Sequence, residues 1–231
     1  MKAFIVTGTS RGLGFEICRQ LINPNHLIIS LARNNNDTLV DLALKNGCEM
    51  HFVKFDLQNT EGIPDLIQGI LERAAHPELE SITLINNAAQ VTPLGSIDCC
   101  SPEETIRNVK TNLLAPILLT QALITQTEQR AIQRVIVNIS SGSAKQAAAG
   151  MSVYCASKAA LNMFTSCIQL EGHRSLTTYT VDPGMVDTDM QAEARNEEGF
   201  PLSAFFRDAK EQGSLKSAAD VAKKIVKRDL S

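Results

Sequence analysis

The chain has 231 residues, a net charge of −3 at pH 7, 44% hydrophobic residues and 20% charged residues. This composition is ordinary for a globular protein, and the length suits one domain that buries about 70–75% of its unfolded surface. No block of like charge is present, which argues against nucleic acid or a membrane surface as the main partner.

Short apolar runs alternate along the chain with longer segments of helical periodicity. The runs are continuously apolar, which is typical of parallel strands buried on both faces. They predict strands at residues 3–7, 27–31, 50–55, 82–86, 134–139 and 177–181. Helices are predicted at residues 13–22, 37–46, 61–75, 102–127, 153–171 and 218–228, the last with Ser217 as N-cap. The alternation predicts an α/β fold, a single Rossmann-type domain whose doubly wound parallel sheet has six or seven strands and helices on both faces.

One segment interrupts the alternation. Residues 189–214 are polar and contain two glycines and a proline. Long excursions of this kind are often functional, so we expect a lid over the substrate. Phe200, Phe205 and Phe206 either face that substrate or belong to an ordinary core.

The first predicted strand runs directly into a glycine-rich loop, Thr7 to Gly14 (TGTSRGLG). Glycines allow a sharp turn and a close approach of the backbone to a ligand. The free N–H groups and the dipole at the start of the next helix attract a pyrophosphate. A plain turn before a helix is the alternative, but the position after the first strand favours a dinucleotide site.

The end of the second predicted strand indicates which dinucleotide is bound. NAD enzymes usually place an acid there for the ribose hydroxyl, whereas this chain has Arg33 and Asn34. Arg33 is able to bind a 2′-phosphate bidentately, and Arg11 of the glycine loop can reach the same phosphate. The two arginines therefore favour NADP(H) over NAD(H). The alternative interpretation is that both are solvated surface arginines that bind no phosphate.

Two spacings point to a reaction centre. Tyr154 and Lys158 are four residues apart and lie on one face of a predicted helix. Ser141 ends a predicted strand 13 residues before Tyr154. A phenol, an ammonium and a hydroxyl are the groups that a carbonyl reduction needs as acid, charge and hydrogen-bond donor.

Together these pieces resemble the short-chain dehydrogenase/reductase family, in family order from residue 1 to about residue 190. The matching residues are Thr7, Gly8, Gly12, Gly14, Asp56, Leu57, Asn86, Asn87, Ala88, Asn112, Ser141, Tyr154, Lys158, Pro183, Gly184 and Thr188. Within the family, the text around Ser141, Tyr154 and Pro183 most resembles sepiapterin reductases and their bacterial relatives, the benzil reductases.

The resemblance implies a role for each residue of the reaction centre. Tyr154 would be the general acid, and Ser141 would donate a hydrogen bond to the substrate oxygen. Lys158 would bind the nicotinamide ribose. Together with the positive ring of the oxidised cofactor, Lys158 would lower the pKa of Tyr154, and a lowering by two to three units requires about 3–4 kcal/mol of preferential phenolate stabilisation. Asn112 would hold a water that passes protons to Lys158.

The resemblance also implies the contacts of the cofactor. Asp56 would touch the adenine, and capping a turn is its alternative role. Thr188 would bind the carboxamide, and helix N-cap is its alternative role. The complete predicted cofactor site is Gly8, Ser10, Arg11, Gly12, Leu13, Gly14, Arg33, Asn34, Asp56, Leu57, Asn87, Ala88, Tyr154, Lys158, Pro183, Gly184, Val186 and Thr188, with no metal ligand.

Two features depart from the family. Ala89 stands where members usually have glycine, and the sequence stops at Ser231, where members usually continue with another edge strand. Sepiapterin reductases use an acid in that region for the pterin, so we favour a diketone or general carbonyl substrate. The open alternatives are a sepiapterin-like or 3-oxoacyl thioester reductase and, in another class, an NADP-binding sensor or scaffold without turnover.

Six scattered cysteines lack C-x-x-C spacing and indicate neither a zinc site nor a disulfide framework. Free thiols suggest a reducing compartment, and no apolar stretch suits a membrane span or a signal peptide. We therefore expect a cytoplasmic protein. By resemblance, the helices at 102–127 and 153–171 form a dimer interface, so the expected partners are a small carbonyl compound and a second copy of the chain.

Overall fold

The computed structural model describes residues 1–229. Over these residues, six parallel strands form one sheet in the order β3-β2-β1-β4-β5-β6. The strands are β1 (Lys2–Thr7), β2 (His26–Ala32), β3 (Glu49–Lys54), β4 (Ser81–Asn86), β5 (Gln133–Ile139) and β6 (Leu176–Val181). The predicted α/β class is confirmed, and each predicted strand is within one residue of its bounds. The expected chain end at Ser231 lies outside the described residues.

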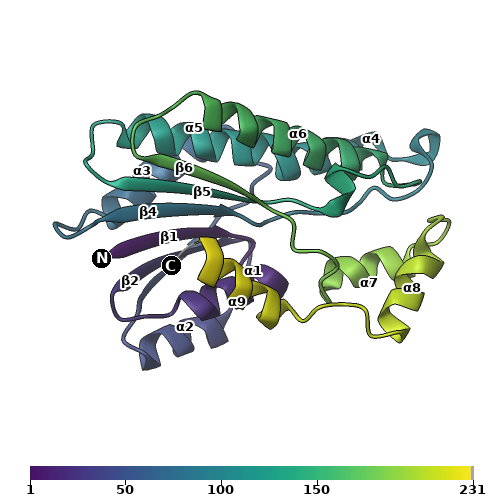
Figure 1. Ribbon diagram of the computed structural model, residues 1–231, viewed down its shortest axis with the longest axis horizontal. Coiled ribbons are helices and arrows are strands. Elements are labelled where there is room, and N and C mark those ends of the chain that lie inside the picture. The colour runs from purple at the N-terminus through teal and green to yellow at the C-terminus, as the bar shows by residue number, and fades with distance from the viewer. Residues whose placement is uncertain (230–231) are drawn as a thin grey trace.

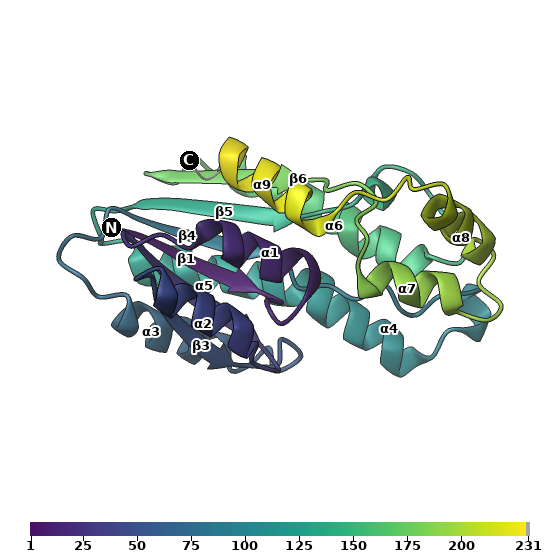
Figure 2. The same cartoon turned by 90° about the horizontal axis from the view of Figure 1, so that it is seen from below.

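Helices cover both faces of the sheet (Figure 1). One face carries α1 (Gly12–Leu21), α2 (Asp37–Lys45) and α9 (Ala218–Asp229), seen in front of the strands in Figure 2. The other face carries α3 (Ile63–Arg73), α5 (Ala115–Thr127) and α6 (Ser152–Leu170). The N–H of Asp220 donates to the Ser217 hydroxyl at 3.1 Å, as the predicted N-cap requires. Within residues 1–229, no helix combines the length and apolar character needed to cross a membrane.

Alternate side chains of β1 enter two hydrophobic cores. Ala3 and Ile5 pack with α3 and α5, whereas Phe4 and Val6 pack with α1 and α9. All four are at most 1% exposed. Burial on both faces explains why β1, β2 and β4 appear in the sequence as apolar runs, whereas β3 and β6, at the two ends of the strand order, are largely unburied.

The predicted helix at 102–127 is not continuous. After α4 (Pro102–Val109), the chain passes through a π-helical turn, Lys110–Leu114, before α5 begins. Pro116 has no N–H, so it cannot donate to the carbonyl of Asn112, the partner that an α-helix would use. A π turn at this point accommodates the missing bond, and such turns are frequent at functional sites.

Residues 189–214 contain two short helices that the sequence analysis did not predict, α7 (Asp189–Asn196) and α8 (Ser203–Glu211). They lie beyond the carboxyl ends of the strands (Figure 1). Phe200 and Phe206 stack with ring centroids 5.8 Å apart and are buried in a cluster that includes Tyr154. These two phenylalanines are therefore core, and Phe205 is 53% exposed.

Candidate active site

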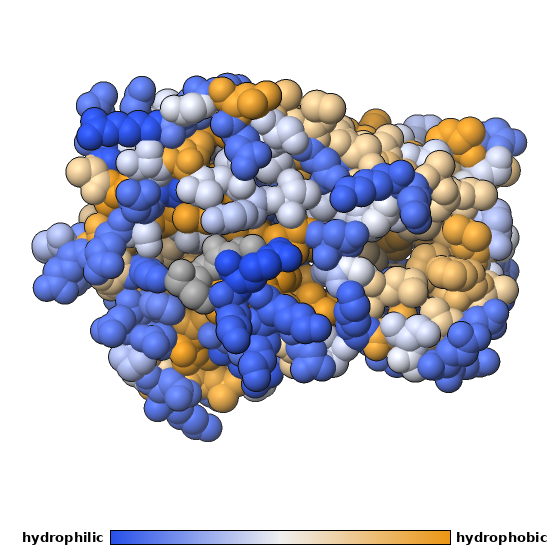
Figure 3. Space-filling view, in the orientation of Figure 1, coloured by the Kyte–Doolittle hydropathy of each residue, from blue (hydrophilic) through white to orange (hydrophobic). Residues whose placement is uncertain are grey.

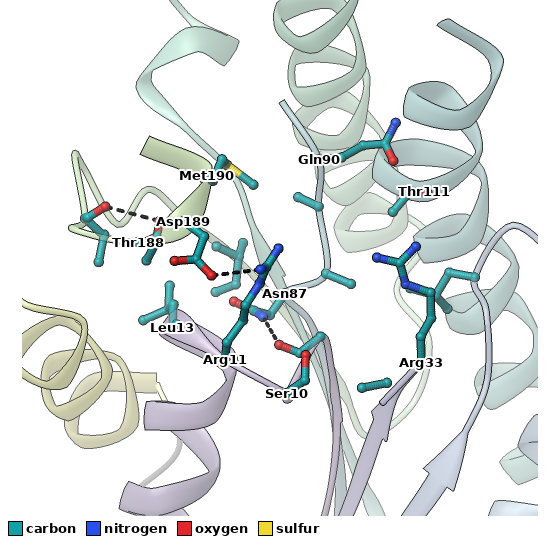
Figure 4. Close-up of a pocket in the computed structure, with 18 of the residues that line it drawn as sticks. Ser10, Arg11, Leu13, Arg33, Asn87, Gln90, Thr111, Thr188, Asp189 and Met190 are labelled. Atoms are coloured by element: carbon teal, nitrogen blue, oxygen red, sulfur yellow. Dashed lines mark hydrogen bonds and ion pairs between the residues drawn. The ribbon is translucent and has the colours of Figure 1, made fainter. Parts of the chain in front are cut away.

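A cavity of about 720 Å³ opens at the carboxyl ends of the strands (Figure 4). Its walls come from the glycine loop, the segments after β2 to β5, α6 and the start of α7. The sequence-predicted residues that line it are Gly8, Ser10, Arg11, Gly12, Leu13, Arg33, Asn34, Asp56, Leu57, Asn87, Ala88, Ser141, Tyr154, Lys158, Pro183, Gly184, Val186 and Thr188. Gly14 and Asn112 are the predicted site residues that do not line it, among the residues that the structure describes.

Three glycines allow close packing around the loop. Gly8 and Gly12 have φ of +72° and +60°, a region that favours glycine. A Cβ on Gly8 would lie 2.8 Å from the Cα of Ala88, and a Cβ on Gly14 would lie 2.2 Å from the Gly8 carbonyl oxygen. Gly14 therefore serves the packing of α1 against the loop, and Gly8 and Gly12 shape the cavity.

The loop is held from the β4 side by hydrogen bonds. The Thr7 hydroxyl accepts the N–H groups of Asn87 and Ala88, each at 3.0 Å, and the Asn87 amide donates to the Thr7 carbonyl at 3.0 Å. The residue before α1, Arg11, provides no side-chain cap. The first-turn N–H groups of α1 are thus left for a ligand, which is the arrangement that binds phosphates at helix N-termini.

The two arginines of the cavity have different surroundings. Arg33 follows β2 and makes no hydrogen bond or ion pair with residues 1–229. Arg11 lies 2.8 Å from an oxygen of Asp189 and 3.9 Å from one of Glu193, both on α7. Figure 4 shows Arg11 turned toward Asp189 and Arg33 on the other side of the cavity. In this structure the arginines do not converge as expected, although an exposed ion pair of about 0–1 kcal/mol is readily exchanged.

Tyr154, Lys158 and Ser141 meet in one wall of the cavity. The Lys158 ammonium donates to the Ile139 carbonyl at 2.8 Å and lies 5.8 Å from the centroid of the Tyr154 ring. Tyr154 is 6% exposed and Lys158 is 2% exposed. Ser141 follows β5 and hydrogen-bonds the Tyr154 side chain. The sequence thus correctly located three polar groups that the fold brings together.

Burial controls the protonation of this wall. Burial raises the pKa of Tyr154 to about 12, and the hydrogen bond with Ser141 opposes the shift without cancelling it. The protein groups alone therefore raise this pKa, because loss of solvent disfavours the phenolate, and the lowering expected from Lys158 together with the oxidised nicotinamide stays a prediction. Burial also lowers the pKa of Lys158 to about 8. Near neutral pH the phenol keeps its proton and most of the lysine is charged.

Asn112 lies behind the cavity wall. Its side chain is fully buried, accepts the N–H of Gln90 at 2.9 Å and donates to the carbonyl of Gln90 at 2.8 Å. The amide is therefore occupied by the loop after β4 and is not available to hold a water. The backbone carbonyl oxygen of Asn112 lacks the donor that an α-helix would supply, because residue 116 is a proline and has no N–H.

For two residues the structure tests the alternative role, and it bears that role out for Asp56 but not for the Thr188 side chain. Asp56 accepts the N–H of Gln58 at 3.0 Å and so caps a turn while it lines the cavity. Thr188 stands directly before α7 but caps nothing with its side chain, because its hydroxyl donates to the Val186 carbonyl at 3.3 Å.

The sequence analysis missed several residues of the lining: Gln90, Thr92, Thr111, Met190 and Gln191. Gln90 and Thr92 follow β4 within a few residues. The rule that ligands bind beyond the carboxyl ends of parallel strands could therefore have predicted both residues. Thr111 comes from the π turn, and Met190 and Gln191 come from α7. Neither the π turn nor α7 was predicted, so no sequence pattern pointed to these three residues.

Comparison with known proteins agrees with this geometry. The family model for short chain dehydrogenases matches residues 2–199. Benzil reductase ((S)-benzoin forming) of Bacillus cereus is 36% identical over 97% of this chain and 92% of its own. Sepiapterin reductase of Bos taurus is 29% identical over 96% of this chain and 87% of its own. The crystal structure of an actinorhodin polyketide ketoreductase variant with NADPH has a TM-score of 0.82 and 26% identity, covering 98% of this chain and 89% of that one.

The Lys158 pKa predicts a pH-dependent stability. The folded-state value of about 8 lies below the ordinary 10.5, so unfolding takes up a proton between these two pH values. The stability linked to Lys158 is thus complete above pH 10.5 and is lost as the pH falls to about 8, at up to about 1.4 kcal/mol per unit. We expect the unfolding free energy of the wild type, relative to Lys158→Met, to rise over this window in urea titrations. Other titrating groups cancel in the difference, and a flat difference would contradict a buried, neutralisable lysine.

Proposed function

Because the chain belongs to the short-chain dehydrogenase family, we propose that it is an NADPH-dependent reductase that transfers a hydride to a ketone or α-diketone. The observation that carries the proposal is the meeting of Ser141, Tyr154 and Lys158 in the wall of a cavity that the glycine loop closes. The similarity to a benzil reductase supports an α-diketone, since benzil is one.

The residues present fit a phosphorylated dinucleotide. Gly8 and Gly12 keep the loop free of side chains where a pyrophosphate would approach, and the first turn of α1 offers uncapped N–H groups. Arg33 lies just beyond the end of β2, where a 2′-phosphate would be recognised. Its guanidinium has no protein partner among residues 1–229 and is free to bind such a phosphate. When bound, NADPH supplies the hydride.

The protein's own part is to provide the proton and to steady the oxygen. Tyr154 gives its phenolic proton to the carbonyl oxygen as the carbonyl carbon is reduced, and its high pKa keeps that proton in place beforehand. The Ser141 hydroxyl donates a hydrogen bond to the same oxygen. The Lys158 ammonium, 5.8 Å from the ring, favours the phenolate left behind.

The phenolate then has to regain a proton from solvent. The side-chain amide of Asn112 is fully used by Gln90 and Asn108, so the backbone carbonyl oxygen of Asn112 is the group to which a relay water would bond. The π turn and Pro116 keep that oxygen out of the helical hydrogen-bond pattern.

The function is tested by replacing Tyr154. Tyr154→Phe removes only the hydroxyl, so benzil-dependent NADPH oxidation should fall at least about 100-fold while the Kd for NADPH changes by less than about threefold. The matched control is Tyr179→Phe, the other tyrosine, which lies 37% exposed on β6 and should keep full activity. Absorbance at the NADPH band measures the rate, and ligand fluorescence measures the Kd.

The same assay separates the alternatives. Sepiapterin and an acetoacetyl thioester are offered beside benzil, and the preferred substrate identifies the type of reductase. Tight NADPH binding without reduction of any carbonyl compound would make the protein a sensor. Full activity of Tyr154→Phe would remove Tyr154 from the reaction.

Cofactor preference depends on Arg33. Arg33→Ala should raise the Kd for NADPH about 10- to 100-fold, the loss of one or two charge-assisted hydrogen bonds, and leave the Kd for NADH nearly unchanged. Arg11→Ala should weaken NADPH binding less, because Arg11 is engaged with Asp189. Arg130→Ala, in the turn between α5 and β5, is the control for loss of an exposed arginine. Equal effects of Arg33→Ala on both cofactors would refute NADPH preference.

We also propose a homodimer formed through α4 and α6. Ile106 is 56% exposed on α4, and Met163 and Leu170 are 66% and 89% exposed on α6. Figure 3 shows apolar side chains along this upper edge of the molecule. Such exposed apolar side chains favour burial in an interface.

A charge placed in that interface should separate the copies. Met163→Glu is expected to sediment as a monomer at concentrations where the wild type sediments as a dimer, because an unpaired carboxylate would be buried. Leu44→Glu, on the exposed side of α2 at 78% exposure, should remain dimeric. A monomeric wild type at tens of micromolar, or a dimeric Met163→Glu, would contradict the interface.

A further inference from the structure

Asn108 has no role in the chemistry proposed above, yet it is the centre of a buried hydrogen-bond network. It lies in the last turn of α4 and is 0% exposed. Its amide donates to two backbone carbonyls, those of Gln90 at 3.1 Å and Thr92 at 2.7 Å. Its carbonyl oxygen accepts from the Asn112 amide at 2.9 Å and from the Ser157 hydroxyl at 3.1 Å.

The network uses the whole capacity of one carboxamide. The group has two N–H donors and an oxygen with two lone pairs, and Asn108 has two acceptors and two donors around it. An aspartate at this position keeps the oxygens but loses at least one donor, and a leucine of similar shape loses all four bonds. Each buried group left without a partner would lose its hydrogen bond without regaining one from water. The surroundings of Asn108 are therefore specific to asparagine.

The four partners lie on the elements that carry the reaction centre. Gln90 and Thr92 line the cavity, and Val91 between them belongs to the hydrophobic cluster that contains Tyr154. Ser157 directly precedes Lys158 on α6. Asn108 thus joins the loop over the cavity to the helix that holds the acid and the ammonium.

We propose that Asn108 is a positioning residue for the reductase, fixing the 90–92 loop relative to Tyr154 and Lys158. This inference rests on the proposed function, and it adds a residue that no pocket contact would reveal. Rates of oriented reactions fall about 100-fold for a displacement of about 1 Å, so a loss of position should appear chiefly in kcat.

Three variants separate the parts of the network. Asn108→Leu removes all four bonds, Asn108→Asp removes at least one of the two donations to Gln90 and Thr92, and Ser157→Ala removes only the link to α6. We expect kcat with benzil to fall about 10- to 100-fold for both Asn108 variants and less for Ser157→Ala. The Kd for NADPH should stay within about threefold, because the glycine loop and Arg33 are untouched.

The matched control is Thr127→Val, which deletes a buried hydrogen bond to Leu123 at 2.5 Å. Thr127 is also 0% exposed, but it is the last residue of α5 and lies toward the amino ends of the strands, away from the cavity. This variant should melt at a lower temperature with an unchanged kcat. Equal losses of kcat in Thr127→Val and Asn108→Leu would show that Asn108 acts on stability alone.

Hydrogen exchange provides a readout that needs no turnover. Amides of residues 90–95 should exchange faster in Asn108→Leu than in the wild type, and should not change in Thr127→Val. Unchanged exchange of these amides in Asn108→Leu would overturn the positioning role. This outcome can be read even if neither the wild type nor the variants reduce a carbonyl compound. An inactive wild type with faster exchange in Asn108→Leu would instead refute the reductase and leave the structural link intact. Wild-type kcat in a folded Asn108→Leu would overturn the inference directly.

Discussion

The rest of the structure depends on the burial of the parallel sheet on both faces. Helices leave room beside β1 only for apolar side chains, as Ala3, Phe4, Ile5 and Val6 show. The polar side chains that line the cavity therefore come from the carboxyl ends of the strands, which all point the same way. The glycine loop, Arg33, Asp56, Asn87 and Ser141 reach one cavity for this reason, although they are distant in sequence.

Within that cavity, the wall around Tyr154 and Lys158 shows how burial sets chemistry. A phenol and an ammonium that share one desolvated region shift in opposite directions, because both lose hydration of the charged form. The result keeps the phenol protonated near neutral pH and brings the pKa of the lysine closer to neutrality. Ser141 and the Ile139 carbonyl hold the two groups by hydrogen bonds, so their separation is set by β5 as much as by α6.

The sequence predicts those features that follow from burial and from strand ends. All strand positions and the cavity-lining residues of the loop, β2 and β5 segments could be predicted in this way. The π turn, α7 and α8 could not, since α7 and α8 bury few side chains and the turn depends on one proline within an otherwise helical pattern. The pairing of Arg11 with Asp189 joins residues from opposite ends of the chain, and no local pattern records it. Likewise, the direction of the Tyr154 pKa follows from its depth in the folded protein, and helical spacing to Lys158 says nothing about depth.

The placement of the aromatic side chains gives the protein an internal optical probe. The chain contains no tryptophan and two tyrosines, one in the cavity wall and one on the outermost strand β6. Its native ultraviolet emission therefore comes from one phenol in the cavity wall and one remote from the cavity. Replacing the remote phenol, as in Tyr179→Phe, leaves Tyr154 as the single tyrosine. Its fluorescence then reports occupancy of the cavity without any label.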